Sequence, residues 1–243
     1  MGTNPAVSLP RADAVRDALR KLELLVVSEN VAGNDTVRHA HLRLPAAAWG
    51  EKDGTVTNSE RRISRQRAFL PLPGSARPDW WAVCEVARRM GFGPAFAFAS
   101  ASDVFGEHAR LSAFENQGTR AFDIGGVAGS TGNAFDELPP FQWPLRKDGT
   151  PQQRLFADGG FFTRDGMARF VAIAPPHLSA AATADRPFVL NTGRIRDQWH
   201  TMTRTGLSPR LLAHIAEPFV EIHPDDAAGL GLEQGALAQL STA

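Results

Sequence analysis

The sequence is short of cysteine and carries no surplus charge of either sign. Cys84 is the single cysteine among 243 residues, which excludes an internal disulfide framework and any metal site made of cysteines alone. Lys and Arg together number 26, as do Asp and Glu, so the formal net charge is zero. A neutral chain has no general attraction for nucleic acid or for an anionic membrane, so any anion binding has to be local.

Long apolar runs are also missing. No segment approaches the roughly 18 consecutive apolar residues that a membrane-spanning helix needs. The first ten residues contain no basic segment of the kind that opens a signal peptide. We therefore expect no membrane partner, no nucleic-acid partner and a cytoplasmic location.

The composition is that of a globular protein. The chain is 43% hydrophobic and 21% charged, enough for a sizeable core in one large domain or two small ones. Residues 1–5 are turn-forming, of the sort that follows a strand, and residues 236–240 have a strand pattern close to the other end. From these two features we expect the chain to be a piece of a longer protein, cut at both ends.

The first part of the sequence alternates helical and extended patterns. Apolar residues recur at a helical period over residues 11–22, and Pro10 fits the first turn of that helix. Leu24–Val27 is a short apolar run typical of a strand buried on both faces. A helical stretch over residues 35–40 then precedes an extended one, Leu42–Pro45. The alternation predicts a Rossmann-like α/β region, in which ligands bind beyond the carboxyl ends of the strands.

A further helix is predicted over Asp79–Met90, closed by Gly91, with Cys84 as a small buried hydrophobe. The residues expected on its inner face are Trp80, Val83, Ala87 and Met90. The signal for regular structure is weak over residues 93–151, which end in a cluster of prolines typical of a connector. We therefore place the boundary between two domains near residue 150, giving domains 1–150 and 151–243.

The second part has the pattern of a small β-barrel. Strands are predicted at residues 154–156, 168–173, 188–190, 219–222 and 236–240. A short helix is expected over Asp225–Gly229, and His223 before it is expected to shape a turn rather than bind a metal. No pair of histidines has the spacing of a zinc site, and we assign no metal ligand and no catalytic residue.

The segment richest in chemistry is 191–206, which begins at the end of a predicted strand. It contains three arginines, four threonines, a histidine and a glutamine. Gly193 allows a close approach of the backbone to a ligand, and arginine and threonine side chains suit phosphate or pterin oxygens. Composition alone is equally compatible with a solvated loop.

As a pattern, segment 191–206 resembles the pterin-dinucleotide-binding loop of bacterial assimilatory nitrate reductases, in the molybdopterin-guanine-dinucleotide oxidoreductase family. It resembles periplasmic nitrate reductases and molybdenum formate dehydrogenases more loosely. Four further segments agree with the family in order and spacing: residues 1–10, 25–29, 49–62 and 77–81. The resemblance covers nearly the whole chain and is weakest over residues 93–142. It implies an α/β fold with a Rossmann-like parallel-sheet segment followed by a partial double-psi β-barrel.

The resemblance also implies where the cofactor, bis-molybdopterin guanine dinucleotide, is held. The residues matching the family's contacts to one dinucleotide are Asn4, Ser28, Glu29, Lys52 and Asp79. Those matching the loop for the second pterin are Thr192, Gly193, Arg194, Gln198, Trp199, His200 and Thr201. Carboxylates can accept the guanine N–H groups, and Lys52 can neutralise a phosphate. Two structural roles compete with these assignments: Asp79 as a helix N-cap and Glu29 as an exposed charge at a strand end.

The activity implied for the parent enzyme is reduction of nitrate to nitrite at molybdenum. Its [4Fe-4S] cluster ligands have no counterpart in this sequence, because Cys84 is the single cysteine. The implied partners are an N-terminal part of the enzyme, an electron donor protein or domain, and nitrate. Two alternatives stay open: a formate dehydrogenase or other molybdopterin oxidoreductase, and a non-enzymatic nucleotide-binding module.

Overall fold

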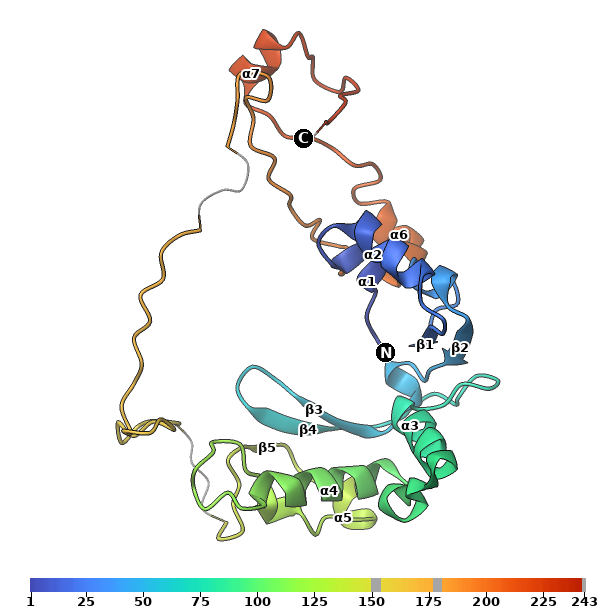
Figure 1. Cartoon of the computed structure of the whole chain (residues 1–243), viewed down its shortest axis with the longest axis vertical. Helices are drawn as coiled ribbons and strands as arrows, with labels where there is room; N and C mark the ends of the chain where they lie inside the picture. Colours follow the sequence, from blue (N-terminus) through green and yellow to red (C-terminus); the bar gives the residue numbers. More distant parts are fainter. Residues whose placement is uncertain (150–153, 177–180, 242–243) are drawn as a thin grey trace. The chain divides into compact units, whose positions relative to one another are not determined.

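The computed structural model describes residues 1–149, 154–176 and 181–241 (Figure 1). The chain divides into two compact units, Met1–Val171 and Ala172–Ala243, and each is described by itself. The domain boundary expected near residue 150 remains a prediction. Among the described residues, no helix is long and apolar enough to cross a membrane.

The first unit begins with the predicted alternation of helices and strands. The elements are α1 (Pro5–Ser8), α2 (Ala12–Arg20), β1 (Val26–Glu29), the 3-10 helix η1 (Val37–His39) and β2 (Leu42–Pro45). Strands β1 and β2 are parallel, with Val26 opposite Leu42 and Glu29 opposite Pro45. The mixed α/β class is therefore confirmed, with a parallel pair of strands at its start.

Three details of this region differ from the prediction. Pro10 lies outside α2, whose N-cap is Arg11 in the left-handed conformation. The helical turn before β2 is shorter than expected. The first strand begins at Val26, and it is not buried on both faces, because Leu24 and Val26 are exposed whereas Val27 and Ser28 are buried. Leu24 and Val26 lie on the same face of the extended chain, and that face is open to solvent at these two positions.

An antiparallel sheet follows that the sequence did not predict. After the 3-10 helix η2 (Trp49–Glu51), β3 (Gly54–Thr57) pairs with β4 (Arg62–Gln66), which pairs with the short β5 (Phe141–Gln142). Asn58 forms the turn of the β3–β4 hairpin, since its Oδ1 accepts hydrogen bonds from the backbone N–H groups of Glu60 and Arg62, both at 3.0 Å. The hairpin is polar, so it carries no apolar alternation from which a strand could be recognised.

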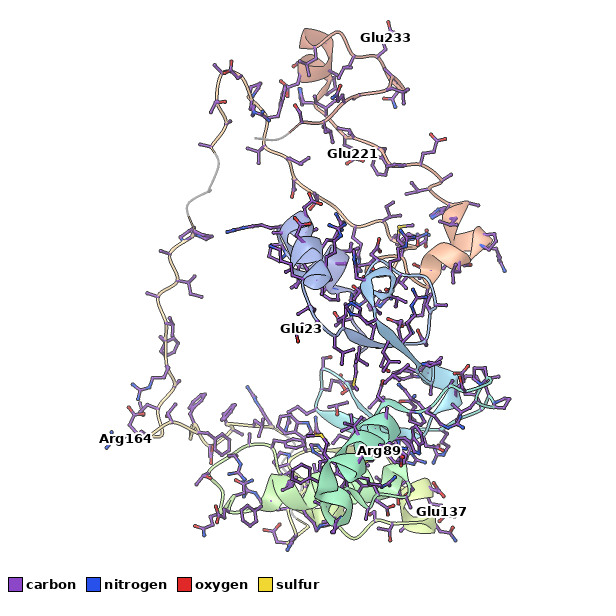
Figure 2. The ribbon with its side chains drawn as sticks, turned by 45° about the vertical axis from the view of Figure 1, so that its right-hand side comes forward. Glu23, Arg89, Glu137, Arg164, Glu221 and Glu233 are labelled. Atoms are coloured by element: carbon purple, nitrogen blue, oxygen red, sulfur yellow. The ribbon has the colours of Figure 1, made fainter. Side chains whose placement is uncertain are left out.

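Helix α3 (Asp79–Ala87) confirms the predicted helix. It continues through a π-helical turn, η3 (Arg88–Phe92), and a 3-10 turn, η4 (Gly93–Phe96), and Gly91 takes the positive φ of 93° that ends the regular helix. Cys84 and Ala87 are buried as expected, but Val83 and Met90 are exposed and do not belong to an inner face. Arg89, labelled in Figure 2, forms an ion pair with Glu85 at 2.6 Å.

The main core of the first unit lies in the region where the sequence signal was weak. Helix α4 (Ala101–Ala113) starts in a capping box formed by Ser100 and Asp103, and η5 (Gly125–Val127) and α5 (Asn133–Asp136) follow. The buried cluster consists of Ile63, Phe105, Ala109, Ile124, Val127, Phe135 and Leu138. It joins α4 to the antiparallel sheet, which runs beside that helix in Figure 1.

The expected strands of the second part are not formed. In residues 154–176 and 181–241 the structure has helices η6 (Thr205–Leu207), α6 (Pro209–Leu212) and α7 (Pro224–Gly229) and no strand, so all five strand predictions are wrong. A strand requires a hydrogen-bonded neighbour, and these segments do not pair with one another. Most of their apolar side chains are exposed, Leu237 completely, and the side chain of Glu221 projects from extended chain (Figure 2).

The short helix of the second unit is confirmed. His223 is the N-cap of α7, and its ring nitrogen accepts a hydrogen bond from the backbone N–H of Asp225 at 3.3 Å. The predicted role of His223 in shaping a turn is therefore confirmed.

Candidate functional site

Two residues of the predicted dinucleotide site meet at the carboxyl end of β1. Ser28, which is 5% exposed, donates a hydrogen bond from its hydroxyl to the carboxylate of Asp79. The chain ahead of α3 runs parallel to the end of β2, because Arg77 donates to the carbonyl of Pro45 at 3.0 Å and Ala47 donates to the carbonyl of Arg77 at 2.9 Å. This pairing brings the first residue of α3 next to the strand edge.

Asp79 is not the N-cap of its helix. Pro78 holds that position, and Asp79 is the first residue of α3. Within the described residues, its carboxylate accepts one side-chain hydrogen bond, from Ser28. The carboxylate therefore keeps acceptor capacity for a further donor.

Glu29 lies at the same strand end but is engaged locally. Its carboxylate accepts from the backbone N–H of Asn30 at 2.8 Å and from the side chain of Asn34 at 3.1 Å. A cavity of about 360 Å³ opens here, and Glu29, Asn30, Arg43 and Glu51 are among its lining residues. An arginine and two carboxylates thus line one concave surface, whereas Ser28 and Asp79 are not among its lining residues.

Asn4 belongs to a buried network rather than to that cavity. Its side-chain oxygen accepts from the hydroxyl of Thr36 at 2.7 Å and from the backbone N–H of Thr36 at 3.2 Å, and its amide donates to Asp35 at 3.3 Å. The sequence analysis missed Asn34, Asp35 and Thr36. Their signal was a run of three residues that favour helix caps, directly before η1.

Lys52 is partly buried and follows η2 in an extended conformation. It forms no ion pair within the described part of the chain, and no described hydrogen bond connects it to Ser28 or Asp79. The structure therefore unites two of the five residues predicted for the first dinucleotide and leaves the other three in separate local arrangements.

The loop of the second unit forms an exposed aromatic and cationic face. The guanidinium carbon of Arg194 lies 5.3 Å from the ring centroid of Trp199, and the ring of His200 packs edge-on against Trp199 with centroids 4.6 Å apart. Thr192 and Gly193 are exposed just before this group. Arg194, Trp199 and His200 thus lie together, and their role in ligand binding remains a prediction.

Gln198 and Thr201, the other two polar side chains predicted for the site, form hydrogen bonds within the second unit. Gln198 is buried and donates from its amide to the carbonyl of Leu211 at 3.3 Å, and Thr201 shares a hydrogen bond of 2.7 Å with Thr203. The side-chain oxygen of Gln198 is buried and has no hydrogen-bond partner among the described residues. An unpartnered buried acceptor of this kind is costly unless a ligand or water supplies a donor.

Asp197 is a residue of this loop that the sequence analysis did not single out. The hydrogen bond from His214 lowers the pKa of the Asp197 carboxyl below its ordinary value, and Arg196, 3.3 Å away, adds to this effect. The signal in the sequence was a lone acid among arginines.

Comparisons with known proteins show which family this sequence resembles. The molybdopterin oxidoreductase family matches residues 1–89, and the molydopterin dinucleotide binding domain matches residues 188–243. A nitrate reductase from Klebsiella oxytoca is 54% identical over 99% of this chain, and an F420-dependent formate dehydrogenase subunit alpha from Methanocaldococcus jannaschii is 32% identical over 99%. The chain spans 27% of the first relative and 34% of the second.

A solved structure supports the fold. The acetylene hydratase from Pelobacter acetylenicus superposes on 97% of this chain and 32% of its own, with a TM-score of 0.68 and 16% identity. The two matched ranges contain the five segments that carried the resemblance. The chain therefore belongs to the molybdopterin oxidoreductase family.

Proposed function

We propose that this chain binds the guanine-dinucleotide arms of a molybdenum cofactor, bis-molybdopterin guanine dinucleotide, in an enzyme that reduces nitrate to nitrite. The observation that carries this proposal is the 54% identity to a nitrate reductase over 99% of the chain, which includes both candidate sites. When bound, the cofactor supplies the two-electron chemistry, and the protein supplies binding and orientation.

The residues of both sites fit such a group. Asp79 has acceptor capacity for the N1–H and exocyclic amine of guanine, and its bond from Ser28 fixes the carboxylate at the edge of the sheet. In the loop, Arg194 offers an exposed guanidinium for phosphate oxygens, and the orphaned oxygen of Gln198 suits an N–H donor of a pterin. The chain's own part in the reaction is to hold the cofactor; no residue described here is assigned a proton or electron transfer.

Other features of the proposal come from the family resemblance. They are the division into domains 1–150 and 151–243, the partial double-psi barrel, a [4Fe-4S] cluster held outside this chain, an electron donor protein or domain, an N-terminal part of the enzyme, and a cytoplasmic location. The family resemblance also supports the contacts proposed for Asn4, Glu29, Lys52, Thr192, Gly193, Trp199, His200 and Thr201.

A deletion of the gene in its source cells tests the substrate. We expect loss of growth on nitrate as sole nitrogen source and normal growth on ammonium. The second candidate, a formate dehydrogenase, is favoured by the 32% identical relative. Unchanged growth on nitrate together with lost formate oxidation would replace the first proposal by the second.

The cofactor is tested on the protein purified through a tag from its own chromosomal locus. We expect molybdenum in the purified protein, and guanosine monophosphate released from it by acid. Absence of both would support a nucleotide-binding module without a redox role and would overturn the proposal.

A further inference from the structure

One acidic residue stands in the cationic region of the second unit. Between residues 192 and 214 the chain has four arginines, and Asp197 is the one acid. It lies three residues from Arg194, in the segment proposed to face an anionic dinucleotide. A free carboxylate here would compete with phosphate oxygens for the arginines. What Asp197 contacts therefore determines whether Arg194 is available to a ligand.

In the structure the carboxylate of Asp197 is held by His214 and Arg196. His214, which follows α6, forms a hydrogen bond through its Nδ1 with Oδ2 of Asp197, and Arg196 lies 3.3 Å from Oδ1. An ionised carboxylate can only accept, so Nδ1 of His214 carries the proton. The lowered pKa of Asp197, caused first by this hydrogen bond, agrees with an ionised carboxylate.

The neighbouring residue is tied to the same segment. The side-chain amide of Gln198 donates to the carbonyl of Leu211 at 3.3 Å. Two consecutive loop residues are thus connected to residues 211–214, which lie at the end of α6 and just after it, beyond η6 in the sequence. Arg194 makes no ion pair among the described residues and lies on the ring of Trp199 instead.

We propose that His214 is a positioning residue for the dinucleotide loop: it holds Asp197 away from Arg194 and, with the Gln198–Leu211 bond, fixes the face formed by Arg194, Trp199 and His200. This inference rests on the proposed function, because the ligand it concerns is the pterin dinucleotide. His214 does not touch the ligand; it acts through Asp197.

The test uses His214→Leu, which removes the donor, and His214→Asn, which keeps an N–H donor near the position of Nδ1. Trypsin cleavage after Arg194 and Arg196 is timed on the 243-residue chain. Molybdenum per polypeptide is measured on protein purified from the chromosomal locus. For His214→Leu we expect cleavage at least threefold faster and at least threefold less molybdenum. For His214→Asn we expect values close to those of the unsubstituted protein.

A double-mutant cycle and a matched control complete the test. Asp197→Ala with His214→Leu should lose no more molybdenum than the worse single variant, since each acts through the other. His223→Leu, which changes a histidine in the cap of α7, should leave cleavage after Arg194 unchanged.

The outcomes distinguish the positioning role of His214 from the assignment of the loop to the cofactor. The positioning role would be overturned if His214→Leu left either the cleavage rate or the molybdenum content unchanged. It would also be overturned if His214→Asn behaved like His214→Leu, or if the losses in the double-mutant cycle were additive. If Arg194→Ala also retains full molybdenum, the assignment of the loop to the cofactor fails, whatever the result for His214.

Discussion

Replacing Asp79 by Asn is the most direct test of the site at the carboxyl end of β1. The carboxylate accepts the Ser28 hydroxyl and retains acceptor capacity. Guanine presents two neighbouring N–H donors, which a carboxylate can accept together and an amide, with one oxygen and an NH₂ group, cannot. We therefore expect Asp79→Asn to weaken guanine nucleotide binding while leaving the fold intact.

The magnitude follows from the charge of the lost acceptor. A hydrogen bond to a charged group contributes about 1.5–3 kcal/mol, which corresponds to a roughly 10- to 150-fold change in affinity. Asp79 is partly exposed, so we expect the lower half of that range. Isothermal titration of the 243-residue chain with GDP measures the effect, and titration with ADP, whose base offers a different donor pattern, measures selectivity.

A matched control separates recognition from helix stability. Asp13 is also an acid in the first turn of a helix, α2, and it pairs with Arg16 at 2.7 Å, away from the strand edge. Asp13→Asn removes the same favourable interaction with a helix dipole, so it should leave GDP affinity unchanged. Equal affinity of the Asp79→Asn and unsubstituted chains for GDP, or an unsubstituted chain that binds ADP as well as GDP, would refute the reasoning.

Four further predictions concern stability, the loop, pH and the exposed apolar surface. Ile124→Ala, at a fully buried core position, should lower the free energy of unfolding of the first unit by about 2–5 kcal/mol in urea titrations, whereas Leu111→Ala at an exposed position of α4 should change it little. Arg194→Ala should lower cofactor affinity about 10- to 150-fold, seen as a protein with normal circular dichroism and much less molybdenum; full molybdenum would contradict the loop assignment. The pKa of Asp197 is lowered in the folded state, so its stabilising effect is present above the unfolded pKa of about 3.9 and is lost as the pH falls through the folded value. Acid should therefore open the loop, which is measured as faster cleavage by pepsin. The acceleration should be smaller in Asp197→Asn than in the unsubstituted chain. The exposed apolar side chains of residues 181–241 should bind anilinonaphthalene sulfonate, and no fluorescence increase would contradict this.

Local features of the sequence determined several elements without tertiary information. Helices α2 and α3 follow from apolar periodicity, and α7 from Pro224 with two acids in its first turn. The buried state of Cys84 and the role of His223 as a cap followed from neighbouring residues alone. Helical hydrogen bonds join residues four apart, so the information for a helix lies within a short stretch of sequence.

The family segments were also visible in the sequence because they are contiguous. The loop 191–206 was recognised as a unit, and the structure places Arg194, Trp199 and His200 together within it. The capping box of Ser100 and Asp103 that starts α4 was equally local. It was overlooked because the surrounding glycines and phenylalanines gave no clear period.

Tertiary structure alone decided the contacts between distant segments. The bond of Ser28 to Asp79 spans 51 residues, the bond of Asp197 to His214 spans 17, and the core joins β4 to α4 and α5. It also decided which apolar runs became strands. The run at β1 found a partner in β2, whereas those at residues 188–190 and 236–240 have none among the described residues. A strand is completed by hydrogen bonds to a neighbour, and its own sequence does not specify that neighbour.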